Sequence, residues 1–173
     1  PPVVERVETE IVDASGAWLV PGFVDLHGHG GSGHSFDDGP AAIAAALAVH
    51  RAHGTTRSVI SLVANPIDEL CESLAGIADL AEVDPLVLGS HLEGPFLAPA
   101  RRGAHNLDHL LEPEPYEVER LIGAARGTLR QITIAPELPG AFEAIDVLVE
   151  AGVLVAVGHT EADFEMTRAA FDR

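Results

Sequence analysis

The chain has 173 residues, of which 47% are hydrophobic and 21% are charged, and this composition is typical of one globular domain. Ten basic and 27 acidic residues give a formal net charge of −17, which excludes nucleic acids and anionic membrane surfaces as expected partners. No apolar run is long enough to cross a bilayer, and the single cysteine, Cys71, fits a reducing compartment. These features predict a soluble, cytoplasmic protein.

The first predicted element covers Val3 to Val12, where apolar residues alternate with acids before the turn Asp13-Ala14-Ser15-Gly16. Such alternation is typical of a half-buried strand. The segment is too short to fold alone, so residues 1–18 are interpreted as the remnant of a small β domain. Residues 19–173 are assigned to a second, larger domain.

From residue 19 onward, apolar β-branched runs alternate with stretches of helical period, the pattern of βα units around a parallel sheet. Strands are predicted over residues 19–27, 56–63, 85–91, 131–135 and 153–157. Helices are predicted over residues 40–52, 66–81, 115–125 and 141–151, and in the segment that ends at Arg173. The fold class is therefore α/β, with about five βα units.

The first long strand ends in His27-Gly28-His29, which sets two imidazoles two residues apart. Strand side chains alternate between faces, so both rings should point to the same side and could grip one metal ion. The glycines that follow, up to Gly33, allow a sharp turn and a close ligand approach. The alternative is a pair of solvated loop histidines.

Other candidate ligands recur at the ends of later strands. Glu93 follows the third long strand and His159 follows the fifth, and parallel strands bring their carboxyl ends to one edge. Neutral imidazoles with a carboxylate suit one or two divalent ions such as zinc or iron. Each residue alone could be an ordinary polar strand cap, but their shared position favours a metal site.

These residues lie in motifs that resemble a known family. Pro21 to Gly31 is similar to the first-strand signature of amidohydrolases. Four further stretches resemble N-acetylglucosamine-6-phosphate deacetylases in particular: His91-Leu92-Glu93-Gly94-Pro95-Phe96-Leu97, Arg102-Gly103-Ala104-His105-Asn106, Ala135-Pro136-Glu137 and Gly158-His159-Thr160. The resemblance implies a (β/α)8 TIM barrel of the amidohydrolase type, of which this chain holds about the first five units.

The resemblance also implies an activity, the hydrolysis of N-acetylglucosamine 6-phosphate to glucosamine 6-phosphate and acetate. His27 and His29 would hold one ion, Glu93 would bind or bridge the ions, and His159 would be a ligand of the other. His105 would polarise the substrate carbonyl. All ten basic residues are arginines, so no lysine is present to be carbamylated as a metal bridge, and Glu93 takes that place.

The resemblance further implies parts that this chain does not contain. A sixth-strand histidine ligand and the aspartate that serves as general acid and base are expected beyond Arg173, and the full-length parent is expected to form a homodimer. Two alternatives stay open: another amidohydrolase, acting as a cyclic amidase or a deaminase, and a non-catalytic half-barrel fragment.

Several further residues have undecided or minor roles at this stage. His91 shares a strand face with Glu93 and is expected to line the site, whereas Glu137 either orients a ligand or caps the next helix. The residues that are interpreted as loop, surface, capping or core positions are His34, Asp37, His50, His53, Cys71, Asp108 and His109.

Overall fold

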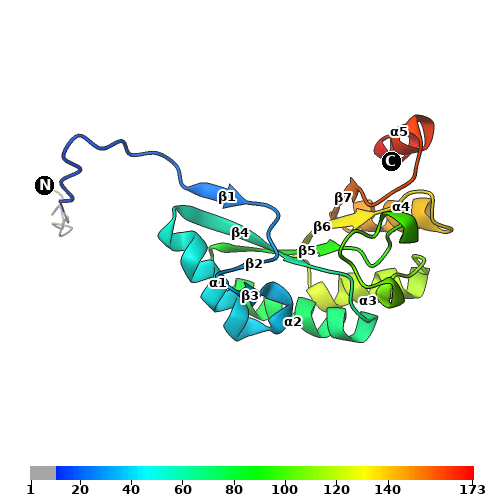
Figure 1. Ribbon diagram of the computed structural model, residues 1–173, viewed down its shortest axis with the longest axis horizontal. Helices are drawn as coiled ribbons and strands as arrows, with labels where there is room; N and C mark the ends of the chain where they lie inside the picture. The colour runs from blue at the N-terminus through cyan, green and yellow to red at the C-terminus, as the bar shows by residue number, and fades with distance from the viewer. Residues whose placement is uncertain (1–10) are drawn as a thin grey trace, which may run out of the picture.

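The computed structural model describes residues 11–173. The predicted strand over residues 3–12 lies almost wholly outside the described residues; its last two positions, Ile11 and Val12, are exposed and have no regular secondary structure. The turn at 13–16 is confirmed, because the amide of Ser15 donates to the carboxylate of Asp13 over 2.8 Å. The segment from residue 11 to β1 extends away from the rest of the chain (Figure 1).

The strands and helices alternate from residue 23 onward. The strands are β1 (Phe23–Asp25), β2 (Gly30–Gly31), β3 (His34–Ser35), β4 (Thr55–Leu62), β5 (Val87–Glu93), β6 (Leu129–Ile134) and β7 (Leu154–Val157). The α-helices are α1 (Pro40–Ala52), α2 (Ile67–Val83), α3 (Pro115–Ala125), α4 (Ala141–Glu150) and α5 (Phe164–Phe171), and short 3-10 turns are η1 (Phe36–Asp38), η2 (Pro99–Arg101) and η3 (Leu107–His109). None of the helices described is long and apolar enough to span a bilayer.

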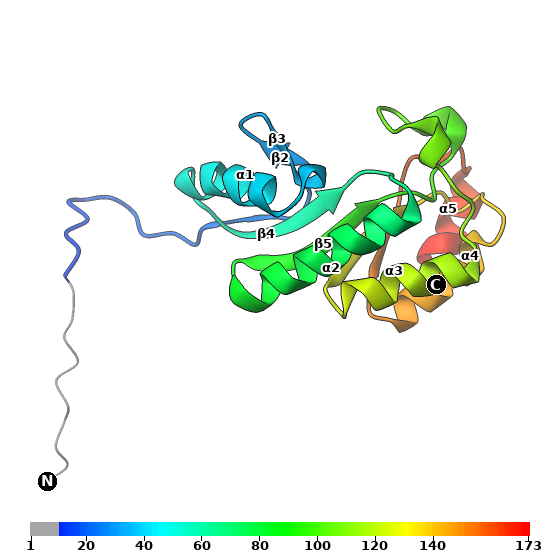
Figure 2. The same ribbon diagram turned by 90° about the horizontal axis from the view of Figure 1, so that it is seen from below.

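Five strands form one parallel sheet in the order β1-β4-β5-β6-β7, which is also their order along the chain. The sheet is curved, with α1, α2 and α3 along one face (Figures 1 and 2). Consecutive parallel strands joined by helices on one side are the arrangement of a (β/α) barrel. The predicted fold class is confirmed as a half-barrel of five βα units.

The core lies between the sheet and its helices. Alternate residues of the strands, such as Ile60, Leu92 and Ile132, are fully buried in one apolar cluster with α2, α3 and α4. The positions between them face the concave side of the sheet, where Ser61 and His91 are also fully buried. The period of two therefore separates an apolar packing face from a polar interior.

The predicted strand over 19–27 is wrong at both ends. Only Phe23–Asp25 forms a strand, because β1 pairs with β4 and its first partner is Thr55, at the very start of β4. Residues before Phe23 therefore have no neighbouring strand to bond, and Pro21 has no N–H to donate.

A small hairpin, β2–β3, follows β1 and was not predicted. Gly30 and Gly31 pair antiparallel with Ser35 and His34. His50 of α1 secures the hairpin, since its Nε2 lies 3.0 Å from the carbonyl oxygen of Gly30. The interpretation of His50 as solvated or capping is therefore wrong, whereas His53 does lie at the C-terminal cap of α1.

Candidate metal centre

Five side chains of the predicted site converge at the carboxyl edge of the sheet. His27 and His29 lie in the loop after β1, Glu93 is the last residue of β5, and His159 follows β7. His105 lies on the long loop between β5 and α3 and is almost fully buried. The His27-Gly28-His29 motif is therefore not part of a strand, but its rings still meet.

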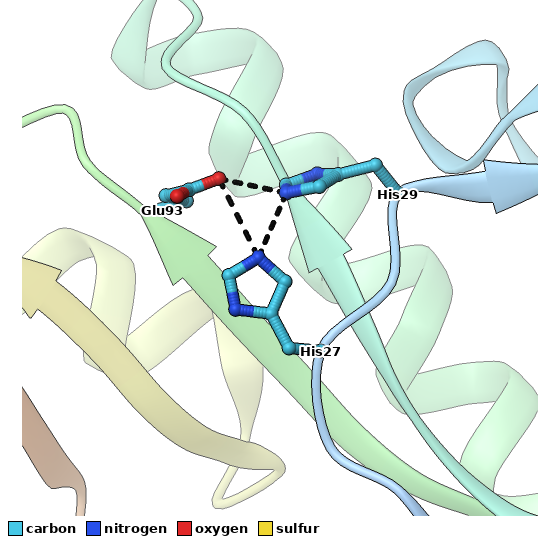
Figure 3. A group of neighbouring side chains, drawn as sticks. All are labelled: His27, His29 and Glu93. Atoms are coloured by element: carbon cyan, nitrogen blue, oxygen red, sulfur yellow. Dashed lines mark hydrogen bonds and ion pairs between the residues drawn. The ribbon is translucent and has the colours of Figure 1, made fainter. Parts of the chain in front are cut away.

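The first group of donors is His27, His29 and Glu93 (Figure 3). The Nε2 atoms of the two histidines are 3.1 Å apart, and Nε2 of His29 is 2.7 Å from Oε2 of Glu93. The loop is held by Gly28, whose amide donates to the hydroxyl of Ser61 and whose carbonyl accepts from the Ser61 amide, both over 3.2 Å. This anchoring directs both rings toward Glu93.

The second group is Glu93, His105 and His159. Nε2 of His159 lies 2.9 Å from Oε1 of Glu93, whereas Nε2 of His105 lies 3.7 Å from Oε2. The two carboxylate oxygens of Glu93 thus face different histidines. Glu93 is therefore placed to be shared by two adjacent ions.

The two histidines of this second group differ in the hydrogen bond of the other ring nitrogen. Nδ1 of His159 lies 2.8 Å from the carbonyl oxygen of Arg101, so Nδ1 carries a proton, and a cation that replaces the proton between Nε2 and Glu93 would meet a lone pair on Nε2. Nδ1 of His105 instead accepts from the amide of Ala64 over 3.2 Å, so a neutral ring carries its proton on Nε2. His159 is therefore prepared to ligate a cation, and His105 to donate a hydrogen bond.

The charges around Glu93 favour its ionised form. Burial alone would raise the pKa of Glu93, but the hydrogen bond with His159 and the neighbouring His29 and His27 hold that pKa below its usual value. Burial lowers the pKa of His105, which favours the neutral ring. An ionised carboxylate is the state that a divalent cation requires.

The donor set fits a divalent cation. One ring nitrogen each from His27 and His29 and one carboxylate oxygen of Glu93 lie within 4.8 Å of one another. Protons cannot satisfy so many acceptors at once, but all three atoms can direct a lone pair at one ion. Nδ1 of His29 is, in the part of the chain that the structure describes, the one buried side-chain polar atom without a hydrogen-bond partner. An ion at Nε2 would fix the proton of His29 on this nitrogen.

His91 lies beneath the first group and is fully buried. Its ring packs edge-on against His27 with 4.8 Å between the centroids, so it lines the site as expected. Both ring nitrogens are engaged, Nδ1 with the Ser61 hydroxyl and Nε2 with the Thr133 hydroxyl, each over 3.0 Å. Burial and the charge of His27 lower the pKa of His91 to about 4, so it stays neutral and has no nitrogen free for an ion.

A hollow of about 480 Å³ opens beside the donors. It is lined by His29, Glu93, His105, the segment 63–65, Ala104, Asn106 and His109. His109 was interpreted as loop surface, which is wrong, because its Nδ1 lies 3.2 Å from the Ala64 carbonyl oxygen. A hollow of this size suits a small polar molecule.

Asp37 and Glu137 connect loops around the site. Asp37 accepts from the amide of Val63 over 3.1 Å and so joins the loop after β1 to the end of β4. Burial raises the pKa of Asp37. Glu137 accepts from the hydroxyl of Thr160 and, over 2.6 Å, from the amide of Glu161. The capping interpretation of Glu137 is wrong, since α4 has no side-chain cap.

Sequence reasoning missed the residues that orient the donors. Ser61 is a fully buried hydroxyl between Ile60 and Leu62 in the apolar half of β4, and a polar residue within that apolar run was the signal that could have found it. The Arg101 carbonyl gave no signal, because a main-chain oxygen is common to every residue. His34, which the sequence places in a loop, belongs to the short strand β3 and is exposed.

Comparison with known proteins identifies the family of this chain. Residues 18–173 match the Amidohydrolase family. The chain belongs to this family. Two curated relatives are the N-acetylgalactosamine-6-phosphate deacetylase of Escherichia coli O157:H7, 34% identical over 98% of this chain, and the N-acetylglucosamine-6-phosphate deacetylase of Lysinibacillus sphaericus, 32% identical over 97%.

Solved structures agree with this assignment. The crystal structure of N-acetyl-D-glucosamine-6-phosphate deacetylase from Mycobacterium smegmatis is 48% identical and has a TM-score of 0.85 over 88% of this chain. The enzyme from Thermotoga maritima is 26% identical, with a TM-score of 0.79. The chain spans 46% and 45% of the two curated relatives and 40% of each of these structures. It therefore corresponds to less than half of each.

Proposed function

We propose that this amidohydrolase chain supplies the metal-binding half of the active site of an N-acetylglucosamine-6-phosphate deacetylase. The observation that carries the proposal is the position of Glu93 between two histidine groups whose free ring nitrogens face it. A structure of the Mycobacterium smegmatis relative in complex with N-acetyl-D-glucosamine-6-phosphate supports the choice of substrate. The single cysteine supports a cytoplasmic location, and the substrate of this relative supports a role in amino-sugar breakdown.

His27, His29, Glu93 and His159 would hold one or two divalent ions, with zinc or iron as the best chemical fit. Such an ion supplies a water of lowered pKa and an electrophile for the amide oxygen. The chain's own contribution is to fix the donors: the Arg101 carbonyl sets the proton of His159, and Ser61 holds the loop of His27 and His29.

His105 would bind the substrate rather than an ion. Its ring lines the hollow, and because Nδ1 accepts from the buried amide of Ala64, a neutral ring carries its proton on Nε2. A donor in this position can meet the acetamide oxygen and stabilise the negative charge that develops on it during attack. The proton that moves to the departing amine would come from the aspartate expected beyond Arg173.

The proposal is tested with the chain alone and with the chain joined to the complementary C-terminal segment of the Mycobacterium smegmatis enzyme. The joined protein should release glucosamine 6-phosphate and acetate in a metal-dependent reaction, whereas the chain alone should bind zinc without turnover. N-acetylgalactosamine 6-phosphate is tested as a second substrate, because one relative is named as its deacetylase.

His105→Gln in the joined protein separates the roles of the donors. Turnover should fall by ~10²–10³-fold, the usual effect of losing one oxyanion donor, while zinc content should stay unchanged. A folded, zinc-loaded joined protein that hydrolyses cyclic amides or deaminates bases, and leaves both amino-sugar phosphates intact, would identify another amidohydrolase. A chain that binds no metal would favour the non-catalytic alternative.

A further inference from the structure

We propose that Glu137 is a positioning residue, which holds His159 in place by anchoring the two residues that follow it. The proposal rests on the proposed function, because it concerns how one of the metal donors is presented. Glu137 lies in the turn after β6, and His159 lies after β7, the neighbouring strand. The two residues do not interact directly, so Glu137 acts through Thr160 and Glu161.

His159 has an unfavourable backbone conformation. Its φ is +52°, in the left-handed region that residues with a side chain rarely adopt. Such a conformation persists only where surrounding contacts determine it, and it is often found at functional sites. The contacts around His159 must therefore hold the backbone as well as the ring.

Two contacts come from the loop that contains η2. The amide of Ala98 donates to the carbonyl oxygen of His159 over 2.9 Å, and Nδ1 of His159 donates to the carbonyl oxygen of Arg101 over 2.8 Å. Before His159, the amide of Gly158 donates to the carbonyl oxygen of Ile134 over 3.2 Å. These bonds hold the residue before His159, the carbonyl of His159 and its ring, and leave the two residues that follow.

Glu137 supplies the contacts on the C-terminal side. One carboxylate oxygen accepts from the hydroxyl of Thr160 and the other accepts from the amide of Glu161 over 2.6 Å. The hydroxyl oxygen of Thr160 in turn accepts from the amide of Ala162 over 2.8 Å, so the whole turn after His159 is bonded. Without the carboxylate, the turn could relax His159 toward an ordinary conformation.

Relaxation would move the free nitrogen of the ring. In the structure, Nε2 of His159 faces Oε1 of Glu93 with the backbone left-handed and Nδ1 at the Arg101 carbonyl. Groups that orient a ligand in this way usually change metal affinity by ~10–100-fold when they are removed. The same magnitude is expected for Glu137.

The test uses the chain in three forms: unsubstituted, Glu137→Ala and Glu137→Gln. The first readout is the backbone conformation of His159, measured without metal from its backbone NMR chemical shifts. The shifts should report a positive φ in the unsubstituted chain and an ordinary negative φ in Glu137→Ala. Glu137→Gln should restore the original state, because its amide can accept from Glu161 and donate to the Thr160 oxygen.

The second readout is cobalt affinity, measured by titration with Co²⁺. Glu137→Ala should weaken binding by ~10–100-fold. Glu143→Ala, which removes an exposed carboxylate from the first turn of α4, is the matched control and should change nothing. In a His159→Ala background, Glu137→Ala should have no further effect, because Glu137 acts through His159.

Three outcomes would overturn the proposal. They are an unchanged His159 backbone conformation with unchanged cobalt affinity in Glu137→Ala, even where the melting temperature falls; an equal loss of cobalt affinity in the His159→Ala background; or a Glu143→Ala variant that behaves like Glu137→Ala. A chain that binds no cobalt contradicts the proposed metal centre instead. In that case the backbone conformation of His159 still decides the role of Glu137.

Discussion

At the scale of single residues, the histidines of this site differ in the hydrogen bonds that their ring nitrogens make, and these bonds decide what each ring can do. His159 donates from Nδ1 to a carbonyl, His105 accepts an amide proton at Nδ1, and His91 bonds a hydroxyl through each nitrogen. The proposed roles follow from these bonds: His159 is suited to ligate an ion, His105 to donate a hydrogen bond, and His91 to support the site. Spacing along the chain shows none of these differences.

Replacing Glu93 with glutamine should remove the negative charge that lies between the two donor groups while keeping the size of the side chain. An amide offers one weaker oxygen donor and no charge to balance an ion, so zinc affinity should fall by more than the ~10–100-fold typical of supporting groups. Isothermal titration with Zn²⁺ measures the effect, with the exposed Glu150→Gln as control. Equal affinities in the unsubstituted chain and Glu93→Gln would contradict the central role of Glu93.

Removing the hydroxyl of Ser61 should destabilise the chain. The hydroxyl accepts from the amide of Gly28 and bonds Nδ1 of His91, and Ser61 is fully buried. Ser61→Ala leaves both partners unsatisfied, so the free energy of unfolding should fall by ~1–3 kcal/mol. Urea denaturation measures this free energy, with Ser73→Ala on α2 as the control. A difference below ~0.5 kcal/mol between the two variants would show that the bonds of Ser61 to Gly28 and His91 are unimportant for stability.

At the scale of elements, helices α1 and α2 are joined at their C-terminal ends. Arg51 in the last turn of α1 donates to Asp84, the residue after α2, over 2.7 Å. Asp84 also accepts from the amide of Leu86 over 3.0 Å, which shapes the turn into β5. Because β5 ends in Glu93, this ion pair helps to place the strand that carries the central carboxylate.

Asp84→Asn should lower stability at neutral pH and lose its effect in acid. Burial would raise the pKa of Asp84, but the bonds from Arg51 and Leu86 hold it below 3.8. The folded chain therefore binds fewer protons than the unfolded chain, so the stabilisation is complete above pH 3.8 and is lost as the pH falls through the lower, folded pKa.

The expected loss of unfolding free energy at pH 7 is about 0.2–1 kcal/mol, the range for a partly exposed ion pair. Urea denaturation at pH 7, 5 and 3 measures it. The loss should be the same at the two higher pH values and smaller at the lowest. Glu82→Gln on the exposed side of α2 is the control. A loss that grows as the pH falls would contradict the ion-pair explanation.

At the scale of the whole molecule, the described sheet has two outer edges. β1 and β7 each pair with one strand only, so each presents a row of backbone groups without a strand partner among residues 11–173. Apolar side chains lie exposed along both edges, including Val24 on β1 and Leu154 on β7. Strand edges of this kind readily pair with other chains.

The 173-residue chain should therefore self-associate, and charges on the edges should prevent this. The double variant Val24→Lys and Leu154→Lys should sediment as a monomer at concentrations where the unsubstituted chain forms larger species, because lysines on an edge strand block pairing. Val83→Lys, at an exposed apolar position at the end of α2, is the matched control. A monodisperse monomer without substitutions would refute the prediction.

The sequence by itself determined the alternation of elements and the edge at which the site forms. Apolar periods of two and 3.6 residues are local properties, and prolines marked helix starts such as Pro40 and Pro115. The rule that parallel strands end together then placed His27, Glu93 and His159 near one another. These expectations needed no knowledge of which side chains touch.

Only the tertiary structure decided what each of these groups can do. The length of β1 depended on where β4 begins, at Thr55, because a strand exists only opposite a partner. The protonated nitrogen of His159 depended on a carbonyl at Arg101, and that of His105 on an amide at Ala64. Hydrogen bonds between main-chain groups and distant side chains follow from packing, not from residue type, so no motif in the sequence could contain them.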